Sequence, residues 1–149
     1  MLEDEEDTAN LIRERGNEYG SVTRRPRRCG WFDAVGTRYA AELNKLDVLD
    51  ALDELKVCVG YEIDGKRVDT FPAVSHDLRQ IKPVYEILPG WRSDTLGITD
   101  FKDLPENAQK YVRFLSDQIG VEIGLISTGP ERDQTIILKE SVMESWFKS

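Results

Sequence analysis

The sequence has few of the residues from which disulfide-held or metal-held scaffolds are built. Its 149 residues include only two cysteines, Cys29 and Cys58, and a single histidine, His76. Two cysteines this far apart cannot form a disulfide framework or a CxxC zinc knuckle, and one histidine cannot supply a His-rich metal site. We therefore expect two free thiols and no structural metal, and we interpret His76 as a surface histidine.

Long apolar runs and common catalytic motifs are also absent. The longest apolar runs span only a few residues, whereas a bilayer crossing needs ~20, and the amino terminus is acidic, unlike a secretory signal. The sequence contains no GxxxxGK[ST] phosphate loop, no GxSxG elbow and no HExxH pair. These absences predict a soluble, cytoplasmic protein with no membrane partner and without the usual self-contained catalytic motifs.

Negative charge is concentrated at one end of the chain. The formal net charge is −8 at pH 7, and five of the acidic residues form the run from Glu3 to Asp7. A like-charge block buries nothing, so residues 1–8 are predicted to be a disordered acidic tail, followed by a single α/β domain over residues 9–149. The acidic balance also argues against general nucleic-acid binding.

Apolar spacing and turn residues divide the rest of the chain into short elements. Intervals of three and four residues predict helices over 8–15, from Trp31 to Asn44, and from Pro105 to Gly120, with a short turn or helix between 46 and 55. β-Branched runs predict strands over 55–63, 66–71, 84–88, 121–126 and 134–138, the first two joined by a hairpin at Asp64-Gly65. Strands and helices alternate late in the chain, which indicates an α/β or mixed layer architecture.

Positive charge gathers in one loop. Arg24, Arg25, Arg27 and Arg28 occur within five residues, in a segment bounded by glycines at 20 and 30. Guanidinium groups bind carboxylates and phosphates through two parallel hydrogen bonds, so this loop has the chemistry to hold a small polyanion. A solvated basic loop, or one paired with the chain's own acids, explains the composition equally well. A nucleic-acid patch is less favoured, because no aromatic residues interleave the arginines.

Two further segments have the composition of nucleotide-binding loops. Asn44-Lys45-Leu46-Asp47 matches a guanine-recognition pattern, in which a carboxylate accepts the ring N–H and the exocyclic amine of the base while a lysine stem covers the ring. Ser127-Thr128-Gly129-Pro130 follows a predicted strand, where open α/β sheets place ligand loops. A helix end with capping acids explains the first segment equally well, and an ordinary turn explains the second.

Taken together, several motifs resemble the adenylosuccinate synthetase family over about residues 10–139. They occur in the family's order and are Gly16-Asn17-Glu18-Tyr19-Gly20, Arg25-Pro26-Arg27-Arg28-Cys29-Gly30-Trp31, Lys45-Leu46-Asp47-Val48-Leu49-Asp50, Leu88-Pro89-Gly90-Trp91, Asp103-Leu104-Pro105 and Ser127-Thr128-Gly129-Pro130. The resemblance covers the C-terminal third of that enzyme. It implies the C-terminal portion of a P-loop-NTPase-like mixed sheet with flanking helices and a β-hairpin.

The resemblance implies a GTP-dependent ligase of purine and AMP biosynthesis that joins IMP and L-aspartate. The resemblance implies that the full enzyme is a homodimer. In the family's reaction, GTP phosphorylates the carbonyl oxygen of the base, and the aspartate amine then displaces the phosphate, with Mg²⁺ supporting the transfer. The implied aspartate- and IMP-binding residues are Ser21, Val22, Thr23, Arg24, Arg25, Pro26 and Arg27. The implied GTP-binding residues are Arg27, Lys45, Leu46, Asp47, Ser127, Thr128 and Gly129. The family's phosphate loop, catalytic residues and magnesium ligands are expected to lie outside this chain, which is therefore expected to be inactive alone.

Two departures from the family pattern bear on these assignments. The family's aspartate loop reads Thr-Thr-Gly-Arg where this chain has Val22-Thr23-Arg24-Arg25, and if that glycine needs a positive φ, Arg24 strains or reshapes the loop. A strand that presents the guanine-binding pair is also expected to be missing before Lys45. This loss favours, as an alternative, a non-catalytic binding or assembly module that has kept the scaffold, and it would expose a sheet edge to association.

Overall fold

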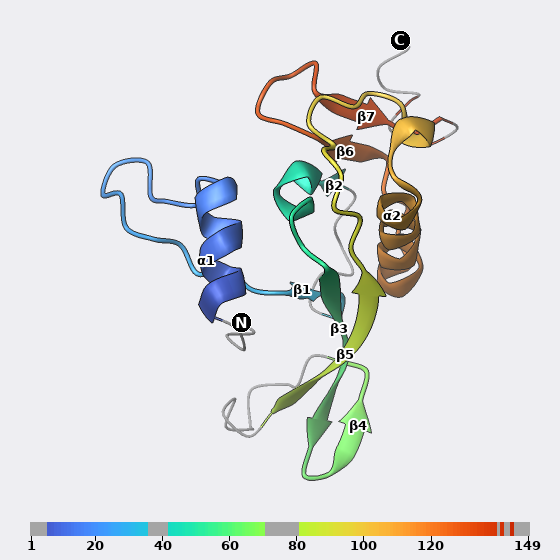
Figure 1. Cartoon of the computed structure of the whole chain (residues 1–149). Coiled ribbons are helices and arrows are strands. Elements are labelled where there is room, and N and C mark those ends of the chain that lie inside the picture. Colours follow the sequence, from blue (N-terminus) through green and yellow to red (C-terminus); the bar gives the residue numbers. More distant parts are fainter. Residues whose placement is uncertain (1–5, 36–41, 71–80, 140, 142–143, 145–149) are drawn as a thin grey trace.

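The chain forms two sheets and two α-helices in the computed structural model, which describes residues 6–35, 42–70, 81–139, 141 and 144 (Figure 1). The elements are α1 (Glu6–Arg15), β1 (Phe32–Asp33), β2 (Glu42–Leu43), the 3₁₀ helix η1 (Leu46–Leu49), β3 (Glu54–Ile63), β4 (Lys66–Val68), β5 (Lys82–Pro89), the 3₁₀ helix η3 (Phe101–Asp103), α2 (Glu106–Ile119), β6 (Leu125–Ser127) and β7 (Thr135–Ile137). The predicted mixed α/β architecture is confirmed. Among the described residues, no helix has the length and apolar character needed to span a membrane.

The long strand β3 organises a four-stranded sheet. β5 pairs with β3 antiparallel along almost its whole length, with an irregular register between Cys58 and Gly60. On the other edge of β3, β1 lies parallel to its middle and β4 lies antiparallel to its end. The β3–β4 turn is Asp64-Gly65, and both residues have positive φ, 50° and 74°, as a two-residue type I′ hairpin requires. The predicted hairpin is therefore confirmed.

The second sheet has β6 in its centre, with β2 parallel on one side and β7 antiparallel on the other. Helix α2 packs its apolar face into a core that includes residues of both sheets, among them Val57 of β3 and Ile126 of β6. As predicted, α2 ends at Gly120, which has φ 66° and donates its N–H to the Ser116 carbonyl at 3.0 Å. The α2 residues of this core are Ala108, Tyr111, Val112, Leu115 and Ile119.

The helix predicted from Trp31 to Asn44 is wrong. The described parts of this segment are β1 and β2, and residues 36–41 lie outside the described chain. β1 is held by β3 and β2 by β6, so sheet pairing overrides the helical spacing of the apolar residues. The strand that was expected to be missing before Lys45 is therefore present: β2 ends at Leu43, two residues earlier.

Other predicted elements occur with shifted ends. Helix α1 begins at Glu6, so the last part of the predicted tail is helical, and acidic residues in its first turn and arginines in its last turn suit the helix dipole. β4 ends at Val68, and β6 begins only at Leu125. Residues 1–5 and the segment 71–80, which contains His76, lie outside the described residues.

A buried carboxylate fixes the segment that follows β5. Asp50 is 7% exposed and accepts hydrogen bonds from Trp91 Nε1 at 2.6 Å, Thr95 N at 2.7 Å and Thr95 Oγ1 at 2.8 Å. Next to Trp91, a Cβ on Gly90 would lie 1.9 Å from the Leu52 carbonyl oxygen, so only glycine fits there. These contacts hold residues 90–95 against the chain that follows η1.

Asp50→Ala is expected to lower the free energy of unfolding by about 3 kcal/mol, because the donors of Trp91 and Thr95 lose their acceptor in a buried place. Urea denaturation followed by tryptophan fluorescence measures the change. Asp94→Ala is the matched control, since Asp94 is exposed and accepts one hydrogen bond, from Leu96 N at 2.9 Å; its effect is expected to stay below about 0.5 kcal/mol. Equal losses in the two variants would contradict the role given to Asp50.

Candidate functional site

The arginine-rich loop extends away from both sheets after α1 and is closed on itself (Figure 1). Gly20 N donates to the Arg25 carbonyl at 2.8 Å, and Arg24 N donates to the Gly20 carbonyl at 2.9 Å. Residues 21–28 are all exposed, and no helix or named strand forms among them. The loop has an irregular backbone and exposed arginines, one of which, Arg27, pairs with Glu18.

Arg24 has a left-handed backbone conformation, with φ 52°. The resemblance places a glycine at this position, and the positive φ that such a glycine would adopt is present here. A side chain in this conformation costs about 1 kcal/mol. Arg24 and Arg25 make no ion pair with any described residue, so the backbone hydrogen bond from Arg24 N to Gly20, and no side-chain ion pair, holds this conformation.

Glu18 connects the arginine loop to the segment that contains Lys45. One of its carboxylate oxygens accepts from Arg27 Nη1 at 3.0 Å, and the other accepts from Lys45 Nζ, which also donates to the Gly16 carbonyl at 2.7 Å. The hydrogen bond from Lys45 is the main cause that lowers the pKa of Glu18, so this carboxylate is ionised at neutral pH. The motifs assigned Arg27 and Lys45 to ligands but gave no sign that Glu18 binds both.

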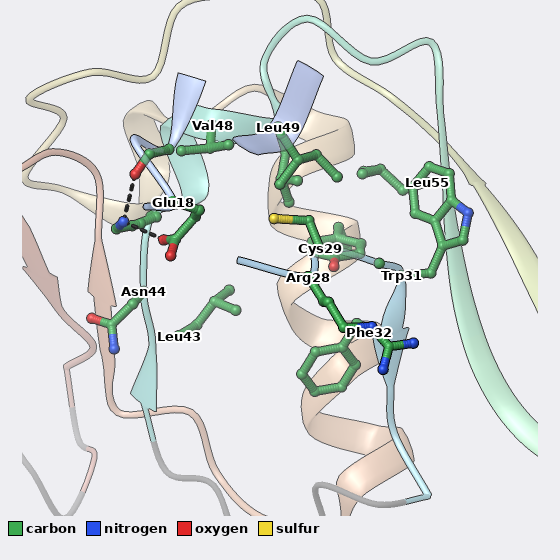
Figure 2. Close-up of a pocket in the computed structure, with 15 residues that line it drawn as sticks. Glu18, Arg28, Cys29, Trp31, Phe32, Leu43, Asn44, Val48, Leu49 and Leu55 are labelled. Carbon is green, nitrogen blue, oxygen red and sulfur yellow. Dashed lines mark hydrogen bonds and ion pairs between the residues drawn. The ribbon is translucent and has the colours of Figure 1, made fainter. Parts of the chain in front are cut away.

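A cavity of about 330 Å³ lies beside this junction (Figure 2). Its walls are mainly apolar, and its polar members include Glu18, Arg28, Asn44 and Lys45. Lys45 itself has a left-handed backbone, with φ 61°, where the chain leaves β2 and enters η1. The apolar lining includes Trp31, Phe32, Leu43, Val48, Leu49 and Leu55.

Asp47 lines a second cavity, of about 470 Å³, together with Arg15, Arg92 and Leu96. Its backbone carbonyl accepts from Arg15 Nη2 at 2.9 Å. One of its carboxylate oxygens, Oδ1, is buried and has no hydrogen-bond partner among the described residues. Burial is the main cause that raises the pKa of the Asp47 carboxyl. Because an unpaired buried acceptor is costly, this oxygen calls for an explanation.

The loop after β6 is tied to the segment that borders the second cavity. Gly97 N donates to the Thr128 carbonyl at 3.1 Å, and Thr128 Oγ1 donates to the Ile98 carbonyl at 2.8 Å. Ser127 Oγ donates to the Gly129 carbonyl at 2.9 Å. Both hydroxyl groups therefore donate their protons within the fold, and Thr128 is fully buried, so only the Ser127 oxygen, as an acceptor, and the backbone can contact a ligand.

The structure does not gather the predicted GTP-binding residues in one pocket. Lys45 lines the first cavity and Asp47 the second, while Leu46 between them is fully buried in the core. Neither cavity is lined by residues 21–27 or by residues 127–129. A ligand that contacts Asp47 and Lys45 together therefore has to bridge the two cavities. It meets Lys45 along the side-chain stem unless Nζ leaves Glu18.

The described residues do not form a site for the magnesium ion that the resemblance implies. No group of three or more histidine, cysteine, aspartate or glutamate side chains is arranged to hold a metal ion within residues 6–35, 42–70 and 81–139.

Comparison with known proteins gives consistent matches to one family. Residues 1–136 match the family described as adenylosuccinate synthetase. The chain is 49% identical over 148 residues to the adenylosuccinate synthetase of Streptococcus gordonii and 50% identical over 137 residues to that of Aquifex aeolicus, which covers 94% and 87% of this chain.

A solved structure agrees with these sequence matches. The fully ligated adenylosuccinate synthetase from Plasmodium falciparum is similar to this chain with a TM-score of 0.83 and 35% identity, over 89% of the chain. The chain spans about a third of the length of these relatives, 34% and 32% of the two bacterial proteins and 34% of the solved structure.

Arg24→Gly is expected to raise the free energy of unfolding by up to about 1 kcal/mol, because it removes the left-handed strain, offset in part by the greater freedom of glycine in the unfolded chain. Urea denaturation measures the change. Arg25→Gly is the matched control: Arg25 is also exposed but lacks a positive φ, so this variant is expected to be neutral or less stable. A loss of stability in Arg24→Gly equal to that of the control would show that residue 24 is not strained.

Proposed function

Because this chain belongs to the adenylosuccinate synthetase family, we propose that it carries the guanine-binding and aspartate-binding parts of a GTP-dependent ligase that joins IMP and L-aspartate in AMP biosynthesis. The observation that carries the proposal is Asp47, which lines a cavity of about 470 Å³ and whose buried Oδ1 has no hydrogen-bond partner among the described residues. This volume lies within the range of small-molecule sites. Guanine presents a ring N–H next to an amino group, and one carboxylate accepts hydrogen bonds from both.

The remaining GTP-binding residues flank Asp47 in this proposal. We assign the stem of Lys45 to one side of the base, because Gly16 and Glu18 already hold its Nζ. The loop Ser127–Gly129 takes the other side mainly through its backbone, since the protons of its hydroxyl groups are donated within the fold. Leu46 is fully buried and holds Lys45 and Asp47 in place from the core.

The arginine loop is proposed to bind the anionic groups of the substrates. Arg25 would hold the aspartate carboxylate and reach the ribose of the nucleotide, and Arg27 would contact both aspartate and the GTP phosphates. The support for Arg25 is its exposure and the lack of an ion pair with any described residue. The Arg27 guanidinium is already oriented by Glu18 at 3.0 Å and would share its donors with the ligand. Ser21, Val22, Thr23, Arg24 and Pro26 complete this loop.

The fold, assembly and location of the full activity are part of the same proposal. We propose that the two sheets belong to a P-loop-NTPase-like fold and that the active form is a cytoplasmic homodimer, with Mg²⁺ as its cofactor. The support is the family membership and the likeness to the Plasmodium falciparum structure. The magnesium ion would neutralise phosphate charge in this chemistry.

We also propose that the 149-residue chain is inactive alone. It contains no GxxxxGK[ST] phosphate loop, and its described residues form no metal site. The alternative, a non-catalytic assembly module, drew its support from the expected loss of a strand before Lys45. That argument no longer holds, because β2 lies at this position and pairs with β6.

The purified 149-residue chain is expected to give no turnover with IMP, L-aspartate and GTP. The physical reason is that binding residues without a phosphate loop can hold substrates but cannot position the transferred phosphoryl group. Ultraviolet absorbance of adenylosuccinate formation measures the rate. Turnover above a protein-free control would contradict the proposed inactivity, and turnover that requires a second polypeptide would support it.

Binding of GDP is expected to be selective over ADP and to depend on Asp47. Calorimetric titration of the unsubstituted chain and of Asp47→Asn tests this expectation. The asparagine replaces one acceptor by a donor, so GDP should bind at least about tenfold more weakly. Xanthosine diphosphate (XDP) should bind more tightly to Asp47→Asn than to the unsubstituted chain, because xanthine has a carbonyl oxygen where guanine has the amine. Glu106→Gln, at an exposed carboxylate that pairs with Lys110 and lines neither cavity, is the control and should leave both affinities unchanged. If Asp47→Asn lost affinity for GDP without gaining affinity for XDP, recognition of the base edge by residue 47 would be contradicted.

The GDP affinity is also expected to fall as the pH is lowered. The Asp47 carboxyl has a raised pKa, so it takes up a proton at a higher pH than an ordinary aspartate and then no longer accepts two hydrogen bonds. The hydrogen bonds donated by the base favour the ionised carboxylate, so bound GDP lowers the pKa of Asp47. At pH values where the free carboxyl is partly protonated, binding therefore releases a proton. The same titrations repeated at lower pH measure the effect, and Asp47→Asn is expected to lack it.

A further inference from the structure

Leu96 is a large apolar residue that is exposed beside Asp47. Its relative exposure is 53%, and it lines the same cavity as Asp47. A single exposed leucine needs no explanation by itself. This leucine differs from a surface residue on a free loop because the chain is anchored immediately before and immediately after it.

The anchor before Leu96 is the carboxylate of Asp50. Thr95 is fully buried, and both its N–H and its hydroxyl donate to Asp50, at 2.7 and 2.8 Å. The N–H of Leu96 itself donates to Asp94 Oδ1 at 2.9 Å. Three hydrogen bonds therefore fix the backbone that presents this side chain on the wall of the cavity.

The anchor after Leu96 is the loop that follows β6. Gly97 N donates to the Thr128 carbonyl, and Thr128 Oγ1 returns a hydrogen bond to the Ile98 carbonyl. The Leu96 side chain also lies close to this loop, since a Cβ added to Gly129 would be 3.0 Å from Leu96 Cδ1. Leu96 thus lies between Asp47 and Gly129, the residues proposed to bind the edge of the base and to close over it.

We infer that Leu96 is a base-contacting residue. Its side chain packs next to Gly129 on the face of the purine ring opposite the Lys45 stem, while Asp47 binds the edge of the ring. This inference rests on the proposed function and adds a residue outside every motif that carried the family resemblance. The polar groups of a purine lie on its edge, and its two faces need apolar contact when they leave water. A rigidly held leucine provides such a surface without hydrogen-bonding groups of its own.

The two residues should therefore differ in what they contribute. Hydrogen bonds to Asp47 distinguish guanine from adenine, because the two bases differ along the edge. Contact with Leu96 involves the ring face, which the two bases share. Leu96 should raise the affinity for both nucleotides and leave the ratio of their affinities unchanged, whereas Asp47 should set that ratio.

Calorimetric titration of the 149-residue chain with GDP and ADP tests the inference. Leu96→Ala is expected to weaken GDP binding about tenfold and to leave the ratio of GDP to ADP affinity unchanged. Ile87→Ala is the matched control, because Ile87 is 55% exposed on β5 and lines neither cavity. It should bind GDP like the unsubstituted chain. Leu96→Phe, which enlarges the apolar surface, should bind GDP at least as tightly as the unsubstituted chain. This second variant tests the inference even if Leu96→Ala lowers the stability of the fold.

The outcomes separate this inference from the proposed function. Unchanged GDP binding by Leu96→Ala, with the loss in Asp47→Asn intact, overturns the role of Leu96 and leaves the proposed function standing. Equal losses in Leu96→Ala and Ile87→Ala, or a weaker GDP complex with Leu96→Phe, also overturn it. A complete lack of GDP binding by the unsubstituted chain overturns both.

Discussion

The hydrogen bonds accepted by the buried Asp50 carboxylate hold together the parts of the chain from which the candidate site is built. On one side, Asp50 follows η1, which contains Asp47 and is preceded by Lys45. On the other side, it binds Trp91 and Thr95, and the next residues bind the loop after β6. A carboxylate with three donors in a core is strongly stabilised by them and costly without them. The position of the segment 91–96 beside Asp47, on the wall of the second cavity, therefore depends on this interaction.

The parts of the fold that sequence predicted well are those whose cause is local. The Asp64-Gly65 hairpin follows from two adjacent residues that tolerate positive φ, and the end of α2 follows from Gly120. The segment from Trp31 to Asn44 was mispredicted because β1 and β2 are only two residues long. Their partners lie in β3 and β6, far along the chain, and no pattern within the segment encodes that pairing.

The candidate site shows the same division. Motifs located Lys45 and Asp47, but their spacing could not reveal that the two residues line different cavities on either side of the buried Leu46. Glu18 and Leu96 were missed because their roles depend on tertiary neighbours. One partial signal existed: the Leu88–Trp91 motif contains Gly90, which has no room for a side chain, and Trp91, which donates to Asp50.

The left-handed backbone of Arg24 also affects how the arginine loop meets a ligand. A glycine at this position would let the loop sample many backbone angles in the free protein, whereas an arginine has only a narrow range with positive φ. With residue 24 held at φ 52° and the loop closed by two backbone hydrogen bonds, fewer conformations remain to be lost on binding. An anion that bound this loop would thus meet a backbone with fewer alternative shapes than a glycine at residue 24 would allow.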